Sequence, residues 1–110
     1  MFLRECKTVK DKQRFAMEYH GIECQQRKLV EEVHELNEAI TKYETRLASG
    51  ETPDVNTIVT EIADVKNLIE QIQGKYLIDN IIVNEEKFKK IERHFKEMEA
   101  EIKAGVKENA

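Results

Sequence analysis

Two short stretches of the chain carry pairs of carboxylates at a spacing that suits a shared metal ion. Glu32 and Glu35 are three residues apart, and so are Glu61 and Asp64 further along. Three residues is close to one turn of an α-helix, so both members of each pair would leave the same helix face. Hard divalent cations prefer oxygen ligands, and Mg²⁺ is usually held by a few carboxylates plus water and phosphate oxygens. Four acids on two neighbouring helices therefore predict a site for a divalent cation.

Apolar stripes run beside both acidic pairs. On a helical wheel of about 100° per residue, the first stripe is Leu29, Val33, Leu36, Ile40, Tyr43 and Leu47, and the second is Ile58, Ile62, Val65, Ile69 and Ile72. Glu32 and Glu35 lie on the shoulder of the first stripe, with Glu31 further out. Glu61 lies at the edge of the second stripe, with Asp64 just beyond. Carboxylates crowded at a helix seam repel one another unless they are protonated or bridged by cations. A solvated or salt-bridged face is the alternative for either pair alone.

The first helix is expected just upstream of this region. Thr8 is placed as an N-cap with Asp11 three residues later, which approximates a capping box, and Gly21 is placed to end the helix. Phe15 and Tyr19 are predicted to face the core.

The two acidic helices are expected to form an antiparallel hairpin. A helix is predicted over residues 22–48, stopping at Gly50. Thr52 as N-cap and Pro53 at the first helical position then predict a third helix, for which Gly74 is the natural end. The loop is short, so the two helices should lie side by side.

The remainder of the chain is predicted to add one more helix. Residues 75–83 are rich in β-branched side chains and suit either a strand or a helical turn, and we interpret them as a helix-like packing segment. Asn84 is expected to cap the last helix. The apolar stripe of that helix consists of Phe88, Ile91, Phe95, Met98 and Ile102.

Length and composition favour one all-α domain. The chain has 110 residues, of which 40% are hydrophobic and 36% are charged. That balance is lean in apolar content and favours amphipathic helices that complete their core by oligomerisation. We expect an antiparallel bundle of about four helices over residues 1–104, with a frayed tail at 105–110.

Several classes of protein are disfavoured by the same composition. The net charge of −4 and the lack of a basic stripe argue against binding to nucleic acid. The chain contains neither an apolar run of membrane-spanning length nor a signal peptide, so we expect no membrane partner and a soluble, cytoplasmic protein. Cys6 and Cys24 lack a zinc-site spacing and are interpreted as reduced thiols. A Walker A loop, a dinucleotide-binding glycine turn and a nucleophile motif are all missing.

The acidic pattern resembles a known signature. Its elements are Lys28-Leu29-Val30-Glu31-Glu32-Val33-x-Glu35-Leu36-x-x-Ala39-Ile40 and, further along, Glu61-Ile62-Ala63-Asp64-Val65. This arrangement is similar to that of the all-α nucleoside triphosphate pyrophosphohydrolases, the superfamily of MazG, dimeric dUTPases and phosphoribosyl-ATP pyrophosphatase. The resemblance covers about residues 21–73, and the flanks match only loosely.

The resemblance implies a metal-dependent hydrolase. Glu32, Glu35, Glu61 and Asp64 are then ligands of Mg²⁺, or of Mn²⁺ in its place. The implied reaction cleaves a nucleoside triphosphate between the α and β phosphates, giving a monophosphate and pyrophosphate, in the service of nucleotide-pool cleansing. Glu31 could orient or deprotonate the attacking water, and a surface salt bridge is its alternative role. The family's habit of assembly implies a homodimer or homotetramer.

Substrate contacts are assigned to polar residues around this motif, each with a structural alternative. Gln25 and Lys28 resemble the family's Gln-x-x-Lys approach to the motif, although Lys28 could simply pair with a neighbouring acid. Asn67 could contact the base or sugar, or be a surface residue. Lys90 and Arg93 resemble a Lys-x-x-Arg element of some relatives that reaches phosphate oxygens, or belong to an exposed charged face.

A second function hypothesis comes from another class of protein. The same helices could form a non-catalytic interaction or scaffold protein that keeps the fold without the chemistry. Release of pyrophosphate in the presence of Mg²⁺ separates the two hypotheses.

Overall fold

All regular structure in the chain is helical within the residues that the structure describes. The computed structural model describes residues 2–105. A 3-10 helix, η1 (Leu3–Glu5), is followed by four α-helices: α1 (Val9–His20), α2 (Ile22–Ala48), α3 (Asn56–Lys75) and α4 (Asn80–Lys103). The prediction of an all-α fold with about four helices is confirmed for this range.

Helix α1 begins and ends where the capping residues predict. The Thr8 hydroxyl accepts a hydrogen bond from the Asp11 N–H at 3.0 Å, and the Asp11 carboxylate accepts one from the Thr8 N–H at 3.3 Å. Hydrogen bonds to the Asp11 carboxylate, first from the Thr8 backbone and then from the Thr8 side chain, lower the pKa of Asp11. Gly21 ends the helix with φ +83°, a conformation that side chains disfavour. The capping box and the glycine stop are both confirmed.

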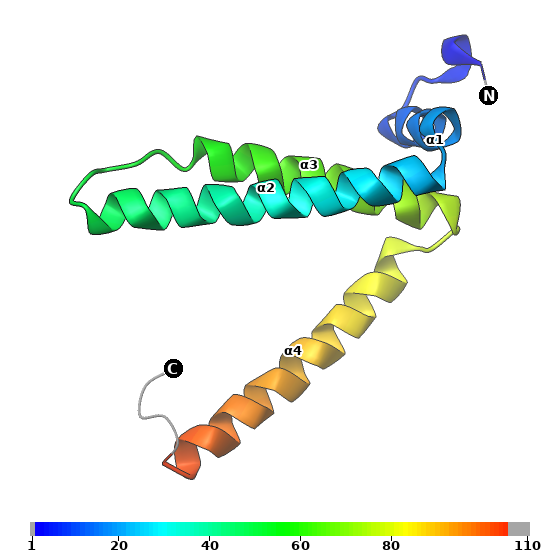
Figure 1. The fold of residues 1–110 in the computed structure, drawn as a ribbon. Coiled ribbons are helices and arrows are strands. Elements are labelled where there is room, and N and C mark those ends of the chain that lie inside the picture. Colours follow the sequence, from blue (N-terminus) through cyan, green and yellow to red (C-terminus); the bar gives the residue numbers. More distant parts are fainter. Residues whose placement is uncertain (1, 106–110) are drawn as a thin grey trace. The chain divides into compact units, whose positions relative to one another are not determined.

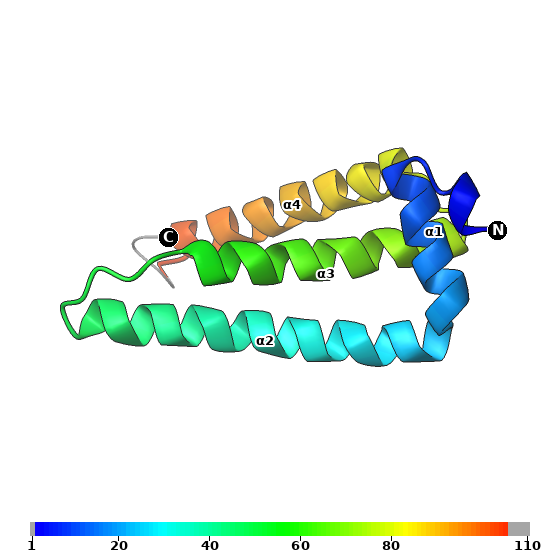
Figure 2. The same cartoon turned by 90° about the horizontal axis from the view of Figure 1, so that it is seen from above.

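Helices α2 and α3 form the predicted antiparallel hairpin, and they lie side by side in both ribbon views (Figures 1 and 2). Helix α2 has 27 residues, or about 40 Å at 1.5 Å per residue. Helix α1 crosses the hairpin at the end where α2 begins and α3 finishes (Figure 2). Few of the described side chains are buried, and the apolar ones are Met17, Ala39 and Leu68.

The start of α3 differs from the prediction. Thr52 and Pro53 precede the helix, which begins only at Asn56. The Asp54 side chain accepts hydrogen bonds from both the backbone N–H and the side-chain amide of Asn56 at 2.8 Å. This local Asp turn offers the backbone an alternative to a helical turn. Placing the N-cap at Thr52 was therefore wrong.

The two aromatic residues predicted for the core of α1 have different surroundings. Phe15 is half-buried, as predicted. Tyr19 is 75% exposed, so its core assignment was wrong. Its ring stacks on Phe15 with centroids 6.3 Å apart and meets the His20 ring edge-on at 4.9 Å. These local ring contacts hold Tyr19 on the outside of the helix.

The segment that sequence alone left ambiguous divides between a helix end, a turn and a helix start. Helix α3 continues through Gly74 to Lys75, and the turn that follows places Leu77 at φ +54°. Helix α4 then begins at Asn80, because the Asp79 carboxylate accepts a hydrogen bond from the Ile81 N–H at 2.9 Å. Asn84 lies inside α4, so its prediction as the N-cap was wrong.

The described residues group into two compact units. The first ends at Leu77 and holds α1, α2 and α3, and the second begins at Ile78 and holds α4. A single domain over residues 1–104 stays a prediction. Of the predicted tail, Gly105 follows the end of α4 with φ +76°, and residues 106–110 lie outside the described range.

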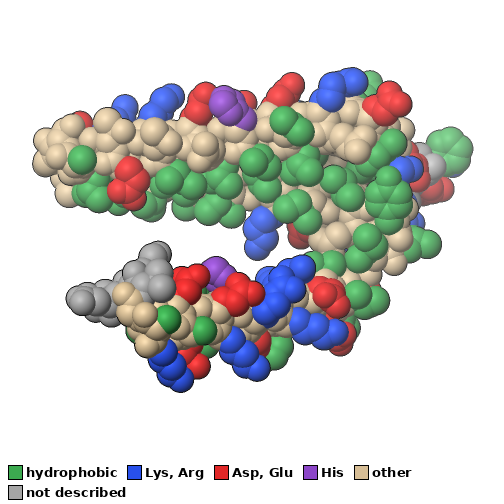
Figure 3. Space-filling model, turned by 60° about the horizontal axis from the view of Figure 1, so that its bottom comes forward, with side chains coloured by type: hydrophobic (Ala, Val, Ile, Leu, Met, Phe, Trp, Pro, Cys, Tyr) green, Lys and Arg blue, Asp and Glu red, His purple; other side chains and the backbone are tan. Residues whose placement is uncertain are grey.

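The hairpin presents an apolar band on one face. The band consists of Val33, Ile40 and Leu47 on α2, Val55 directly before α3, and Ile62 and Ile69 on α3, and each is between 42% and 50% exposed. Within each helix these residues recur every seven positions, so they share one face. On the wheel, Val33 and Ile62 lie on the side of their stripes away from Glu32 and Glu61. Hydrophobic side chains gather along the length of the hairpin in Figure 3.

Candidate metal centre

Three of the four predicted ligands come together on the hairpin. One carboxylate oxygen each from Glu32, Glu61 and Asp64 lies within 4.8 Å of the other two. Glu32 projects from α2, and the other two project from α3. Glu32 and Glu61 are half-buried, whereas Asp64 is exposed. The antiparallel pairing of two helices thus brings together acids that are about thirty residues apart in the chain.

Two of these acids carry an oxygen that the protein does not satisfy. The Oε2 atoms of Glu32 and Glu61 are shielded from solvent and accept no hydrogen bond from any described residue. A buried polar atom without a partner costs about 1–3 kcal/mol, and more if it is charged. Both oxygens therefore need a proton or a cation.

Burial and the neighbouring negative charges raise the pKa values of the half-buried acids. Burial, and then the negative charges of Glu35 and Asp64, raise the pKa of Glu32 from 4.5 to about 7. The same causes, burial first, raise the pKa of Glu61. Glu35 is exposed and lies outside the close three-residue group, yet its negative charge acts on both half-buried carboxylates. All four predicted acids are thus coupled, and a cation would relieve their repulsion.

The donor set fits a hard divalent cation. Mg²⁺ holds oxygens at about 2.1 Å, so two ligands on opposite sides of one ion lie about 4.2 Å apart. The 4.8 Å spread of the three carboxylates is wider by well under 1 Å, which side-chain adjustment can close. Carboxylates alone suit Mg²⁺ or Mn²⁺ better than soft-ligand metals. The exposed side at Asp64 leaves room for water and phosphate oxygens.

A chain of side-chain amides lies on the same hairpin. Gln25 is only 3% exposed, and its Nε2 donates to Gln71 Oε1 at 2.7 Å. Gln71 in turn donates to Asn67 Oδ1 at 3.4 Å. Gln13 of α1 donates to Asn67 at 3.1 Å and to Glu70 at 3.3 Å. The structure thus links two of the predicted substrate residues, Gln25 and Asn67, through one intermediate amide.

Gln71 and Gln13 are polar members of this network that sequence reasoning missed. Gln71 follows Asp64 by seven residues, just as Gln25 precedes Glu32 by seven. Seven residues is two helical turns, so this spacing was the available signal. It also places the amide pair about 10 Å along the hairpin from the carboxylates. The Oε1 atom of Gln25 is buried and has no hydrogen-bond partner among the described residues, so it remains an open acceptor.

The other predicted site residues are exposed. Lys28 lies on α2 between Gln25 and the acids, about one turn from each, and Glu31 lies further round the same helix. Lys90 and Arg93 are on α4, where Arg93 Nε lies 3.9 Å from a Glu97 oxygen. Their functional roles stay predictions.

The chain matches no family model, no curated protein and no solved structure. None of the helices in the described part has the length and apolar character needed to cross a bilayer. Cys6 and Cys24 do not form a disulfide.

Proposed function

We propose that the protein is a Mg²⁺-dependent nucleoside triphosphate pyrophosphohydrolase. It hydrolyses the bond between the α and β phosphates and yields a nucleoside monophosphate and pyrophosphate. The observation that carries this proposal is the group of Glu32, Glu61 and Asp64, with two buried oxygens that nothing in the described chain satisfies. The resemblance of the acidic motif to the pyrophosphohydrolase signature supplies the reaction class.

The acids have two proposed roles, which are metal binding and activation of the attacking water. Mg²⁺, or Mn²⁺ in its place, held by Glu32, Glu61 and Asp64 with Glu35 beside them would neutralise phosphate charge and lower the pKa of a bound water. Glu31 lies outside the close group and is exposed. Its proposed role is to orient the attacking water and accept its proton as the pyrophosphate leaves.

Polar residues along the hairpin position the nucleotide. Asn67 is exposed and can contact the base or sugar, and Gln25 shares its amide network through Gln71 and would position it. Lys28 lies between the amides and the acids, where an ammonium suits phosphate oxygens. Lys90 and Arg93 are proposed as further phosphate contacts from α4.

The test is pyrophosphate release from a panel of canonical and modified nucleoside triphosphates, measured with millimolar Mg²⁺ and with EDTA. The proposal expects release from at least one substrate, loss of release in EDTA, and a monophosphate as the second product. The exposed Glu44→Gln on α2 is the matched control and should keep full activity. A panel without any Mg²⁺-dependent turnover would reject the enzyme.

The alternative is a non-catalytic interaction protein. The apolar band of the hairpin favours it, because six half-exposed aliphatic residues on one face form a contact surface that chemistry does not require. The same band supports the proposal that the active protein is a homodimer or homotetramer. Self-association by itself is compatible with both functions, so the nucleotide panel decides between them.

A further inference from the structure

Apolar residues recur along the whole of α4 in a heptad pattern. The helix begins at Asn80, so Ile81 extends the apolar stripe by one heptad. The stripe occupies the first and fourth heptad positions, a and d: a is Ile81, Phe88, Phe95 and Ile102, and d is Asn84, Ile91 and Met98. Asn84 is the only polar residue in these positions. Three heptads of this kind are typical of a coiled-coil seam.

Nothing described within its own unit covers this stripe. Ile81, Phe88 and Phe95 are 64%, 63% and 58% exposed, and Ile91 is 55% exposed. An isolated helix of this length is marginal in water, and helices in proteins gain most of their stability by packing an apolar face. The seven seam positions would bury roughly 100 Å² each. Two copies of the stripe would then bury about 1,400 Å², within the range of a stable dimer.

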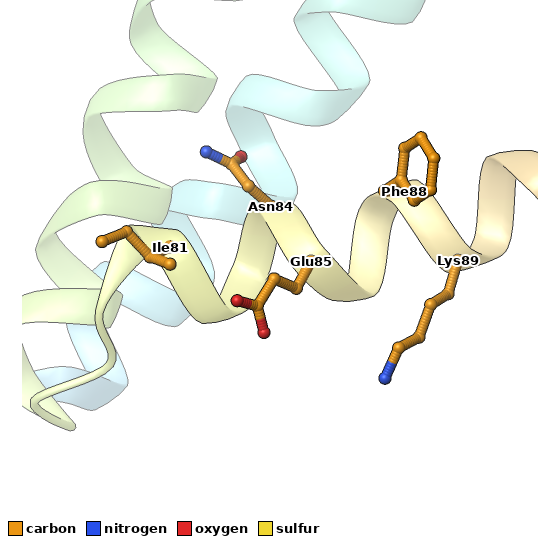
Figure 4. Close-up of a pocket in the computed structure, with 5 residues that line it drawn as sticks. All are labelled: Ile81, Asn84, Glu85, Phe88 and Lys89. Atoms are coloured by element: carbon orange, nitrogen blue, oxygen red, sulfur yellow. The ribbon is translucent and has the colours of Figure 1, made fainter.

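The surface of α4 carries an open depression beside its apolar stripe. A shallow depression is lined by Ile81, Asn84, Glu85, Phe88 and Lys89, all from this one helix (Figure 4). The first four occupy heptad positions a, d, e and the next a. In a parallel coiled coil, these four positions surround a d side chain of the facing helix. The depression is therefore placed to receive the d residue of a second, parallel α4.

Charges beside the seam select the parallel orientation. The e positions are Glu85, Glu92 and Glu99, and the g positions are Asn80, Lys87, His94 and Glu101. A parallel pair would set Lys87 against Glu92 of the other helix, and His94 against Glu99, which is favourable. An antiparallel pair would oppose e to e and bring the glutamates together. The ion pairs Lys89–Glu86 at 3.5 Å and Arg93–Glu97 at 3.9 Å lie on the outer face. His94 and Glu99 pair within the helix, with Glu97 at 3.8 Å and Lys103 at 3.7 Å, and these exposed contacts would be exchanged for the contacts across the seam.

We propose that α4 pairs with α4 of a second copy of this chain as a parallel two-stranded coiled coil. The Asn84 side chains of the two copies face each other, and their amides hydrogen-bond across the seam and hold the register. The apolar seam supplies the affinity, and the e and g charges supply the orientation.

The first test uses charge reversal and measures the dissociation constant by sedimentation or light scattering of the full chain. The parent should be at least a dimer, with twice the 12.9 kDa chain mass or more. Glu92→Lys should raise the dissociation constant about tenfold or more at low salt, because two attractive pairs become repulsive. Lys87→Glu should do the same, and the double variant should restore the parent value. Lys96→Glu, at an exposed outer position of α4, is the control and should leave the dissociation constant unchanged.

The outcomes separate α4 pairing from other contacts. A monomeric parent overturns the proposal. So does an assembly unaffected by Glu92→Lys, because it would be held elsewhere, as by the apolar band of the hairpin. Failure of the double variant to recover also overturns it, since the two residues would not then face each other.

The second test measures orientation by disulfide cross-linking. In a Cys6→Ser, Cys24→Ser background, Asn84→Cys should form a cross-linked dimer under mild oxidation. An antiparallel pair would bring residue 84 beside residue 102 and leave the two thiols about 27 Å apart along the axis. Lack of a cross-link in a variant that still associates would exclude the parallel seam.

Discussion

Replacing Glu32 with Gln tests the metal centre through stability, independently of turnover. Glu32 keeps one oxygen buried and unpartnered, and its pKa is raised from 4.5 to about 7. A group whose folded pKa is raised above its unfolded pKa destabilises the fold once it ionises. The cost is absent below pH 4.5, grows between pH 4.5 and 7, and is constant above pH 7. The neutral amide removes that cost.

The size of the effect follows from the pKa shift. About 2.5 pH units at 1.36 kcal/mol each give an upper limit of about 3 kcal/mol at pH 8. Water and salt screen a half-buried carboxylate, so we expect 1–2 kcal/mol, or roughly 4–10 °C in melting temperature. The metal-free Glu32→Gln protein should therefore melt above the parent at pH 8 and close to it at pH 4.5.

Adding Mg²⁺ should reverse the order of the two melting temperatures, so that the parent melts above Glu32→Gln. Ions that bind only the folded parent stabilise it by about 1.4 kcal/mol at ten times Kd, and Glu32→Gln should lose most of this gain. The assay is a set of thermal melts of parent, Glu32→Gln and the exposed control Glu44→Gln, each with EDTA and with millimolar Mg²⁺. If the metal-free variant melts at or below the parent at pH 8, or if all three proteins gain equally from Mg²⁺, then Glu32 is an ordinary surface acid and the proposed centre fails.

Three further predictions address the same residues. The apparent Mg²⁺ dissociation constant, measured by calorimetry, should rise about tenfold from pH 8 to pH 6, because protons compete for Glu32 below its pKa of about 7; a constant value would contradict the site. Asp64→Asn should abolish both pyrophosphate release and Mg²⁺ stabilisation, whereas Glu31→Gln should reduce release and keep the stabilisation; equal Mg²⁺ shifts in Asp64→Asn and the parent would remove Asp64 from the site. Gln71→Ala should cost about 1–3 kcal/mol in urea unfolding, because it strands the buried Gln25 amide, and a loss under 0.5 kcal/mol would show that water replaces the bond.

Local sequence signals determined the all-α class and most helix boundaries. Thr8 with Asp11 and then Gly21 defined α1, because capping depends on groups within one turn. Where several local signals competed, the choice was wrong. Pro53 was predicted to begin α3, but the Asp54 side chain forms a turn that delays the start of the helix. Asn84 was predicted to cap α4, but Asp79 caps it more than one turn earlier. In each case an aspartate side chain accepts a hydrogen bond from a backbone N–H two residues later, and this bond sets where the helix begins.

The periodicity of the acids also determined that each pair shares a helix face. Whether the two pairs meet depends on the register between α2 and α3, which the loop and the packing seam set together. The register in the structure brings Glu32, Glu61 and Asp64 together. Glu35 lies outside this close group and acts on Glu32 and Glu61 first through its negative charge.

Only the tertiary structure decided which polar atoms are left without partners. The buried oxygens of Glu32 and Glu61, and the Gln25–Gln71 amide bond across the hairpin, depend on contacts between residues tens of positions apart. Desolvation is a property of the packed seam rather than of any short stretch of sequence, and it makes an acidic pattern a candidate site for a cation.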